Sequence, residues 1–119
     1  PDVYDVIRCR CSALIAADRG REALALAKSL QKKDKNSPNA YAAGAYVTHV
    51  MGKSKLAGAF ASKALRIDSG HLGAMEILAL SLMDSGKYKE ASIVAGAINE
   101  KDPGNRSAVR VLKECAGRS

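Results

Sequence analysis

The amino-acid sequence predicts an all-α fold built from stacked pairs of helices. Two observations indicate this fold: apolar residues recur with a fixed period of 34 residues, and the composition lacks the aromatic side chains typical of β-sandwiches. Aromatic residues make up 4% of the chain, whereas hydrophobic residues, with Ala and Leu prominent, make up 47%. Small side chains let helices pack closely, and 119 residues are enough for one domain with a continuous core.

The second helix of each predicted pair carries the clearest repeat. Three of its positions are apolar in every copy and recur without a gap, which places them on the buried face of a helix. The three columns are Ala23, Ala57 and Ala91; Ala27, Ala61 and Ala95; and Leu30, Ala64 and Ile98.

The first helix of each pair and the turn after it follow the same period. Its apolar columns are Ile7, Tyr41, Met75 and Val109, and Cys11, Ala45 and Ala79. Asp18, Gly52 and Gly86 form the turn column, where glycine suits a left-handed backbone between two helices. Pro38 marks the start of a helix, and Pro103 follows a helix that it could not continue.

These columns divide a single domain of residues 1–119 into repeats at 4–37, 38–71 and 72–105, followed by a capping helix at 105–116. The first repeat departs from the pattern. It has Asp18 where the others have glycine in the turn, and Lys35 where the third repeat has Pro103. We therefore expect the first repeat to be the most irregular of the three.

Several short runs at this period resemble the tetratricopeptide repeat (TPR) family. They are Gly86-Lys87-Tyr88-Lys89-Glu90-Ala91 and Asp102-Pro103-Gly104-Asn105 in the third repeat, and Gly52, Ala57 and Lys63-Ala64-Leu65 in the second. The family's bulky aromatic near the start of each first helix is replaced by Ile7 and Met75, and only Tyr41 keeps it. The resemblance implies a right-handed superhelix of three helix-turn-helix repeats with a capping helix, acting as a non-catalytic scaffold that binds proteins.

In such a superhelix the first helices line a concave wall, which is the usual binding surface. Projection of the first helices places a largely apolar set of candidate partner-binding residues there: Arg8, Ser12, Ala42, Tyr46, His49, Glu76, Leu80 and Met83, with Ile15, Ala43, Val50 and Ile77 beside them. An apolar wall suits an amphipathic helix, an extended apolar segment or another copy of the superhelix. The alternative is that Ala42, Ala43 and Ile77 only contact the adjacent helix.

One subclass of the family binds the acidic carboxyl terminus of heat-shock chaperones through Lys, Arg and Asn side chains at set columns. The corresponding positions here are Arg8, Ser12, Ala43, Gly73 and Ile77. Only Arg8 can meet a carboxylate, so the sequence lacks this clamp and disfavours, without excluding, a co-chaperone role.

The formal net charge of +7 raises the question of an anionic partner. Lys28, Lys32, Lys33 and Lys35 cluster at the end of a predicted helix, where cations oppose the negative pole of the helix dipole. No aromatic stacking platform accompanies the basic residues, so we expect no nucleic acid as partner. The sequence contains no secretory signal and no apolar run long enough to cross a bilayer, which favours an intracellular protein without a membrane partner.

The sequence predicts no enzyme, metal site or cofactor. His49 and His71 lack nearby Cys or carboxylate residues at metal-ligand spacing, and no phosphate loop or catalytic signature is present. His49 either contacts a partner in the groove or is partly buried and hydrogen-bonded locally. Packing explains Cys11, which shares a column with Ala45 and Ala79, whereas Cys9 and Cys115 are candidate reactive thiols.

A closer resemblance covers roughly residues 8–98. Its landmarks are Arg21-Glu22-Ala23, Asn39-Ala40, Lys63-Ala64-Leu65 and Gly86-Lys87-Tyr88, and their spacing is similar to that in the carboxy-terminal repeats of the family of seventh subunits of the anaphase-promoting complex. This resemblance implies a non-catalytic, cell-cycle scaffold of a ubiquitin ligase in the nucleus and cytoplasm, which contacts other TPR subunits and can self-associate. The alternative is a TPR adaptor of another assembly, either a co-chaperone or a bacterial protein of secretion or envelope assembly.

Overall fold

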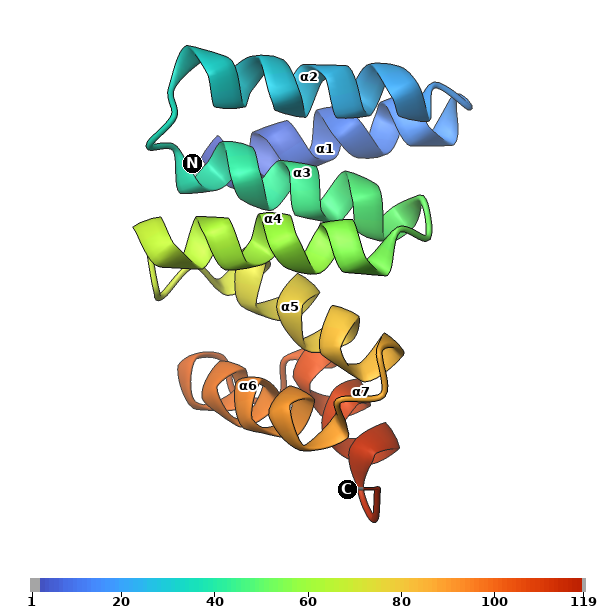
Figure 1. Ribbon diagram of the computed structural model, residues 1–119, viewed down its shortest axis with the longest axis vertical. Coiled ribbons are helices and arrows are strands. Elements are labelled where there is room, and N and C mark those ends of the chain that lie inside the picture. The colour runs from blue at the N-terminus through green and yellow to red at the C-terminus, as the bar shows by residue number, and fades with distance from the viewer. Residues whose placement is uncertain (1–2, 119) are drawn as a thin grey trace.

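The computed structural model describes residues 3–118, which form helices and no strands. The helices are α1 (Val3–Ala16), α2 (Gly20–Lys33), α3 (Pro38–Val50), α4 (Ser54–Ile67), α5 (Leu72–Asp84), α6 (Tyr88–Lys101) and α7 (Arg106–Cys115). From α1 and α2 through α3 and α4 to α5 and α6, the helices stack along the longest axis of a body that measures 41 × 27 × 22 Å, and α7 lies beside α6 (Figure 1). The all-α prediction is confirmed.

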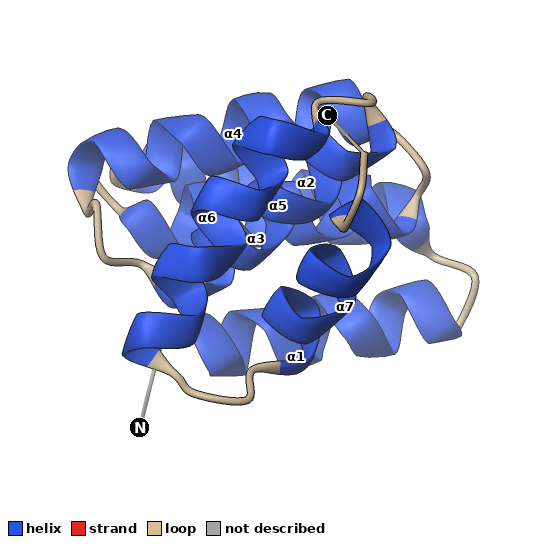
Figure 2. Ribbon diagram, turned by 90° about the horizontal axis from the view of Figure 1, so that it is seen from below, coloured by secondary structure: helices blue, strands red, loops and turns tan. Residues whose placement is uncertain are grey.

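The helices pair as α1–α2, α3–α4 and α5–α6, and α7 follows as an unpaired last helix. The starts of α3, α5 and α7 at Pro38, Leu72 and Arg106 are 34 residues apart, which is the period of the sequence. Seen along the stack, α1 and α7 lie toward one edge of the molecule, and α4 lies toward the opposite edge (Figure 2).

The turn inside each pair has the same backbone in all three copies. Asp18, Gly52 and Gly86 have φ angles of 63°, 81° and 79°, in the left-handed region. The amide after each turn residue donates to a carbonyl in the last turn of the preceding helix: Arg19 to Leu14 at 2.8 Å, Lys53 to Thr48 at 2.8 Å and Lys87 to Leu82 at 2.9 Å. The expectation that the first repeat is irregular is therefore wrong at its turn, because aspartate tolerates the left-handed conformation better than most residues do.

The junctions between pairs repeat as well, through polar residues whose recurrence the sequence analysis did not use. Asp34, Asp68 and Asp102 each end a second helix, and their carbonyls accept from the amides of Ser37, His71 and Asn105. The side chains of these three residues then cap the next helix by accepting from a backbone amide: Ala40 at 3.2 Å, Ala74 at 3.1 Å and Ala108 at 3.0 Å. The sequence contains a signal for these caps, because Ser37, His71 and Asn105, whose side chains can accept hydrogen bonds, recur every 34 residues.

The alanine columns form the centre of the core. Ala23, Ala57 and Ala91 have no exposed surface, and neither do Ala27, Ala61 and Ala95. Because these alanines are fully buried between closely packed helices, a larger side chain in either column would have to push the helices apart. Within residues 3–118, none of the helices has the length and continuous apolar character needed to span a bilayer.

Candidate functional site

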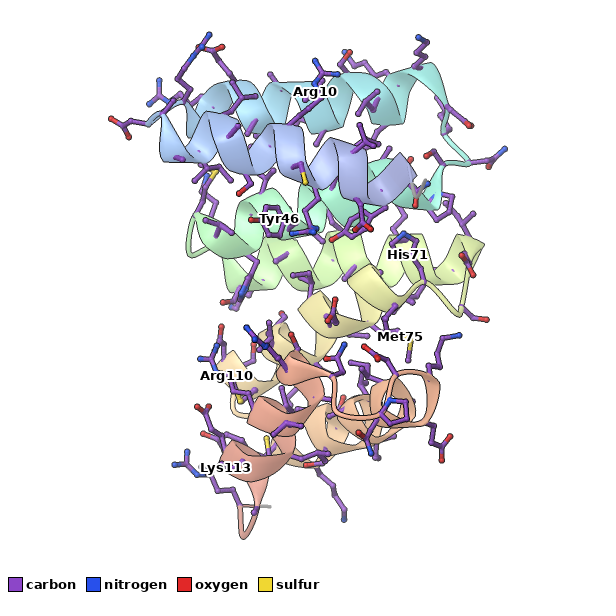
Figure 3. All side chains as sticks on the ribbon, turned by 180° about the vertical axis from the view of Figure 1, so that it is seen from behind. Arg10, Tyr46, His71, Met75, Arg110 and Lys113 are labelled. Carbon is purple, nitrogen blue, oxygen red and sulfur yellow. The ribbon has the colours of Figure 1, made fainter. Side chains whose placement is uncertain are left out.

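A groove of about 620 Å³ runs along the side formed by the first helices. Its walls come from α1, α3 and α5, the first helices of successive pairs, and from α7, as a concave surface of this architecture requires. The lining residues are Tyr4, Asp5 and Arg8 of α1; Tyr46, His49 and Val50 of α3; Leu72, Gly73, Glu76, Ile77 and Leu80 of α5; and Ser107 of α7. We call this surface the concave groove. Figure 3 shows this side of the molecule, with Tyr46 next to α1.

The structure brings five of the predicted residues together in the concave groove: Arg8, Tyr46, His49, Glu76 and Leu80. They come from α1, α3 and α5, the successive first helices whose projection gave the candidate set. That these residues contact a partner stays a prediction.

Three other predicted residues do not line the groove. Ala42 has no exposed surface and packs in the core with Ala45 and Ala57, so it cannot contact a partner. Met83 is 7% exposed and belongs to the core between α5, α6 and α7, while Ser12 is half-buried outside the groove. The prediction failed at Ala42 because α3 packs against α1, α2, α4 and α5, which leaves little of its circumference free.

Tyr4 is a groove residue that the sequence analysis missed. Its ring occupies the space that any side chain at position 73 would need, so Gly73 is the residue that allows this approach. The same ring meets His71 edge-on, with 4.9 Å between ring centroids. Burial raises the pKa of the Tyr4 hydroxyl above its usual range, and the nearby Arg8 guanidinium opposes that rise. Tyr4 therefore extends from α1 across the groove to α5 as a neutral phenol.

The charges of the concave groove nearly balance. The Arg8 guanidinium lies 5.9 Å from the centroid of the Tyr46 ring and 3.7 Å from the Asp5 carboxylate. The Glu76 carboxylate accepts a hydrogen bond from Asn105 Nδ2 at 2.9 Å. Two acids thus offset one arginine, so the groove has no strong field to attract a highly charged ligand.

The two histidines have different surroundings. His71 Nδ1 accepts from the Ala74 amide, so the proton of the neutral ring is on Nε2, which donates to Asn39 Oδ1 at 2.8 Å. His49 Nδ1 is buried and has no hydrogen-bond partner among residues 3–118. The local hydrogen bond considered for His49 is therefore absent at this atom. No group of three or more possible metal-ligating side chains forms within the described part of the chain.

The cysteines also separate into two kinds. Cys9 is exposed, whereas Cys11 and Cys115 are buried. Burial raises the pKa of the Cys11 thiol, which keeps it protonated and unreactive at neutral pH. Cys115, the last residue of α7, packs in the core, so of the two candidate reactive thiols Cys9 is the exposed one.

Comparison with known proteins gives a match in structure but not in sequence. No family model matches the chain, and no curated protein matches it significantly. The Arabidopsis OM64 TPR domain superposes with a TM-score of 0.83 at 18% identity, over 95% of this chain and 93% of that chain. The second TPR domain of human RPAP3, in complex with the HSP70 peptide SGPTIEEVD, gives 0.80 at 18% identity over 92% of each chain.

The TPR2B domain of yeast Sti1, in a complex with Hsp70, gives a TM-score of 0.82 at 15% identity over 98% of each chain. At these identities the likeness establishes the fold alone. The chain has the TPR superhelical fold that the sequence predicted.

Proposed function

We propose that this chain, a TPR superhelix, is a non-catalytic protein-interaction module that binds an apolar segment of a partner protein in the concave groove. The observation that supports the proposal is an apolar surface inside a groove built by successive first helices. Val50 is 45% exposed and lines the groove together with the partly buried Tyr46. The buried Ile77 and Leu80 line it as well. Apolar side chains that remain exposed in a concave surface are typical of binding sites.

The chemistry of the partner follows from the charges. With Asp5 and Glu76 offsetting Arg8, association depends on burial of apolar surface rather than on long-range attraction. An amphipathic helix or an extended segment would place apolar side chains against Tyr46 and Val50. Tyrosine is frequent among residues that dominate binding energy, and the Arg8 guanidinium lies 5.9 Å from the centroid of the Tyr46 ring.

A second candidate is a co-chaperone, and two of the structural neighbours favour it, because they are complexes with Hsp70 or its peptide. The groove itself argues against the same mode of binding. At the positions of the chaperone clamp, Ala43 and Gly73 are buried and offer no side-chain donor, and Ile77 is buried and apolar. Arg8 alone remains to bind a terminal carboxylate.

The finer assignment to the anaphase-promoting complex rests on the sequence landmarks alone, since none of the neighbours described above is named as a subunit of it. In that assembly the concave groove would bind a segment of another TPR subunit. Co-precipitation of tagged full-length protein, followed by identification of the other subunits or of Hsp70, tests both assignments directly.

The groove proposal is tested by selecting ligands from a random peptide library on the immobilised chain and measuring their affinities by fluorescence anisotropy. We expect apolar sequences to be enriched. Replacing Tyr46 and Val50 together with Ala should weaken their binding about tenfold or more, since tenfold corresponds to about 1.4 kcal/mol. The control is Ile93→Ala, because Ile93 is 70% exposed on α6 and does not line the groove.

The HSP70 peptide SGPTIEEVD serves as the second probe. Unchanged affinity of the selected peptides for the Tyr46 and Val50 double variant would exclude the concave groove as the site. Tight binding of the HSP70 peptide that is abolished by Arg8→Ala would instead favour the co-chaperone candidate.

A further inference from the structure

A second groove, which shares no lining residue with the concave groove, lies between α2 and α4 and has a volume of about 540 Å³. Figure 1 shows α3 between these two helices, and Tyr41 of α3 is one of the lining residues. Lys28, Lys32 and Lys35 line one wall, from α2 and the loop after it, and Lys63 lines the other wall from α4. We call this surface the lysine groove.

The floor of the lysine groove has a defined structure. At Gly44, α3 has no side chain, and Gln31 and Phe60 lie over it: a Cβ at this position would be 2.8 Å from Gln31 Nε2 and 3.4 Å from the Phe60 ring. Gln31 Nε2 also donates to the Ala40 carbonyl at 3.4 Å. The groove therefore combines an aromatic floor, formed by Phe60 and Tyr41, with cationic walls.

The positive charge of this groove is not compensated. No carboxylate is among its lining residues, and the ion pairs found within residues 3–118 involve Arg8, Arg19 and Arg110 rather than these lysines. Lys28 and Lys32 are one helical turn apart, where like charges repel. The Lys63 ammonium lies 4.8 Å from the centroid of the Tyr41 ring, which orients it but does not neutralise it.

The acid nearest along the chain to Lys32 and Lys35 is Asp34, and its carboxylate is engaged locally. Asp34 Oδ1 accepts from the Asn36 amide at 2.9 Å in the loop after α2. This acid does not line the groove.

The helix dipole accounts for only part of this cluster. Lys32 and Lys33 are in the last turn of α2, where cations are favourable. Lys28 is not in that turn, Lys33 does not line the groove, and Lys63 comes from α4, whose last turn carries Arg66 instead. Lysines from two helices therefore converge on one groove. The dipole of a single helix cannot explain why they lie together.

We propose that the lysine groove binds a carboxylate-rich segment of a partner protein, as a second interaction surface independent of the concave groove. Charge complementarity selects the acidic residues of that segment, and the partly exposed Phe60 ring accepts an apolar side chain between them. A nucleic acid fits less well, because Tyr41 is 6% exposed and Phe60 is left as the one ring lining the groove on which a base could stack.

The test measures binding of two fluorescently labelled peptides to the whole chain by anisotropy. One peptide is rich in Glu with two Leu residues, and the other has every Glu replaced by Gln. We expect the Glu peptide to bind, to weaken several-fold between about 50 mM and about 300 mM salt, and the Gln peptide not to bind. The variant is Lys28→Glu with Lys63→Glu, one change on each wall of the groove.

The matched control is Lys33→Glu with Lys89→Glu, which changes the net charge equally at two exposed lysines outside the groove. Circular dichroism melting shows that each variant is folded. We expect the groove variant to lose about tenfold or more in affinity and the control to lose less than about threefold. The double Ala variant of Tyr46 and Val50 should bind the Glu peptide normally, which separates this proposal from the concave groove.

Three outcomes would overturn the proposal: absence of binding by the parent chain, equal losses in groove variant and control, or tighter binding of single-stranded RNA than of the Glu peptide at the same salt. Equal losses would mean that net charge alone attracts the peptide. Tighter binding of RNA would assign the groove to a nucleic acid instead.

Discussion

The middle helix pair, α3–α4, and the first pair, α1–α2, follow the same sequence pattern but differ in how deeply they are buried. Of the two first helices, α3 contributes eight buried residues, whereas the described part of α1 contributes Tyr4 and Cys11. α3 packs against α1, α2, α4 and α5, while α1 packs mainly against α2 and α3. The difference shows that the repeat pattern specifies the pair, and that the neighbours of a pair determine how much of it is buried.

Local signals do not show this difference. Asp18 in the first pair and Gly52 in the middle pair have the same left-handed backbone and equivalent hydrogen bonds. The turn is thus a property of each pair alone. We therefore expect substitutions at core positions to have different effects in the two pairs, and substitutions at turns to have similar ones.

The largest expected effect is overpacking at the middle pair. Ala57→Leu should lower the free energy of unfolding by about 1 to 3 kcal/mol, because Ala57 is fully buried where α3 and α4 cross. Ala23→Leu, at the same column of the first pair, should cost less, because α2 packs less extensively against its two neighbouring helices than α4 does and can shift more easily. Urea denaturation of both variants checks the order, and an equal loss would contradict the comparison.

An intermediate effect is expected at the junctions. His71→Ala removes the N-cap of α5 together with the hydrogen bond to Asn39, and should destabilise the chain by about 1 to 2 kcal/mol. Ser37→Ala removes only the cap of α3, between the first and middle pairs, and should cost about 1 kcal/mol or less. Thermal melting of the two variants side by side is the measurement. A larger loss for Ser37→Ala would show that the first junction is the more important one.

The smallest effect is expected at the turns, with opposite signs. Asp18→Gly should stabilise the chain by about 0.5 kcal/mol, because glycine adopts a positive φ without strain. Gly52→Ala should destabilise it by about 1 kcal/mol from backbone strain alone, since nothing lies within 4 Å of a Cβ at this position. Differential scanning calorimetry resolves changes of this size. Loss of stability in Asp18→Gly would mean that the aspartate side chain has a role beyond tolerating the turn.

The 34-residue columns predicted most of the fold because each column reports a local requirement. An alanine at positions 23, 57 and 91 indicates close helix crossing, and a residue tolerant of positive φ at positions 18, 52 and 86 indicates the turn. These requirements are met within one helix pair. They can therefore be recognised in the sequence without knowing which helices pack beside that pair.

The concave groove was predicted less completely because it depends on contacts between pairs. Ala42 was assigned to the wall, yet helices on several sides of α3 bury it. Tyr4 was missed because its partners, Gly73 and His71, are two repeats away in the chain. The lysine groove shows the same limit: Lys28, Lys32 and Lys35 were visible as a cluster, but their convergence with Lys63 depends on how α2 and α4 stack.

The position of Tyr4 has a mechanical consequence. Stacked repeats normally contact only their immediate neighbours. Such a molecule can therefore stretch and twist at one interface between repeats without disturbing the others. Tyr4 of α1 rests on Gly73 of α5 and so links the first pair to the third. This link makes the superhelix stiffer at the amino-terminal end of the concave groove. A force that pulls the first pair away must extract the tyrosine ring before the middle pair can bend.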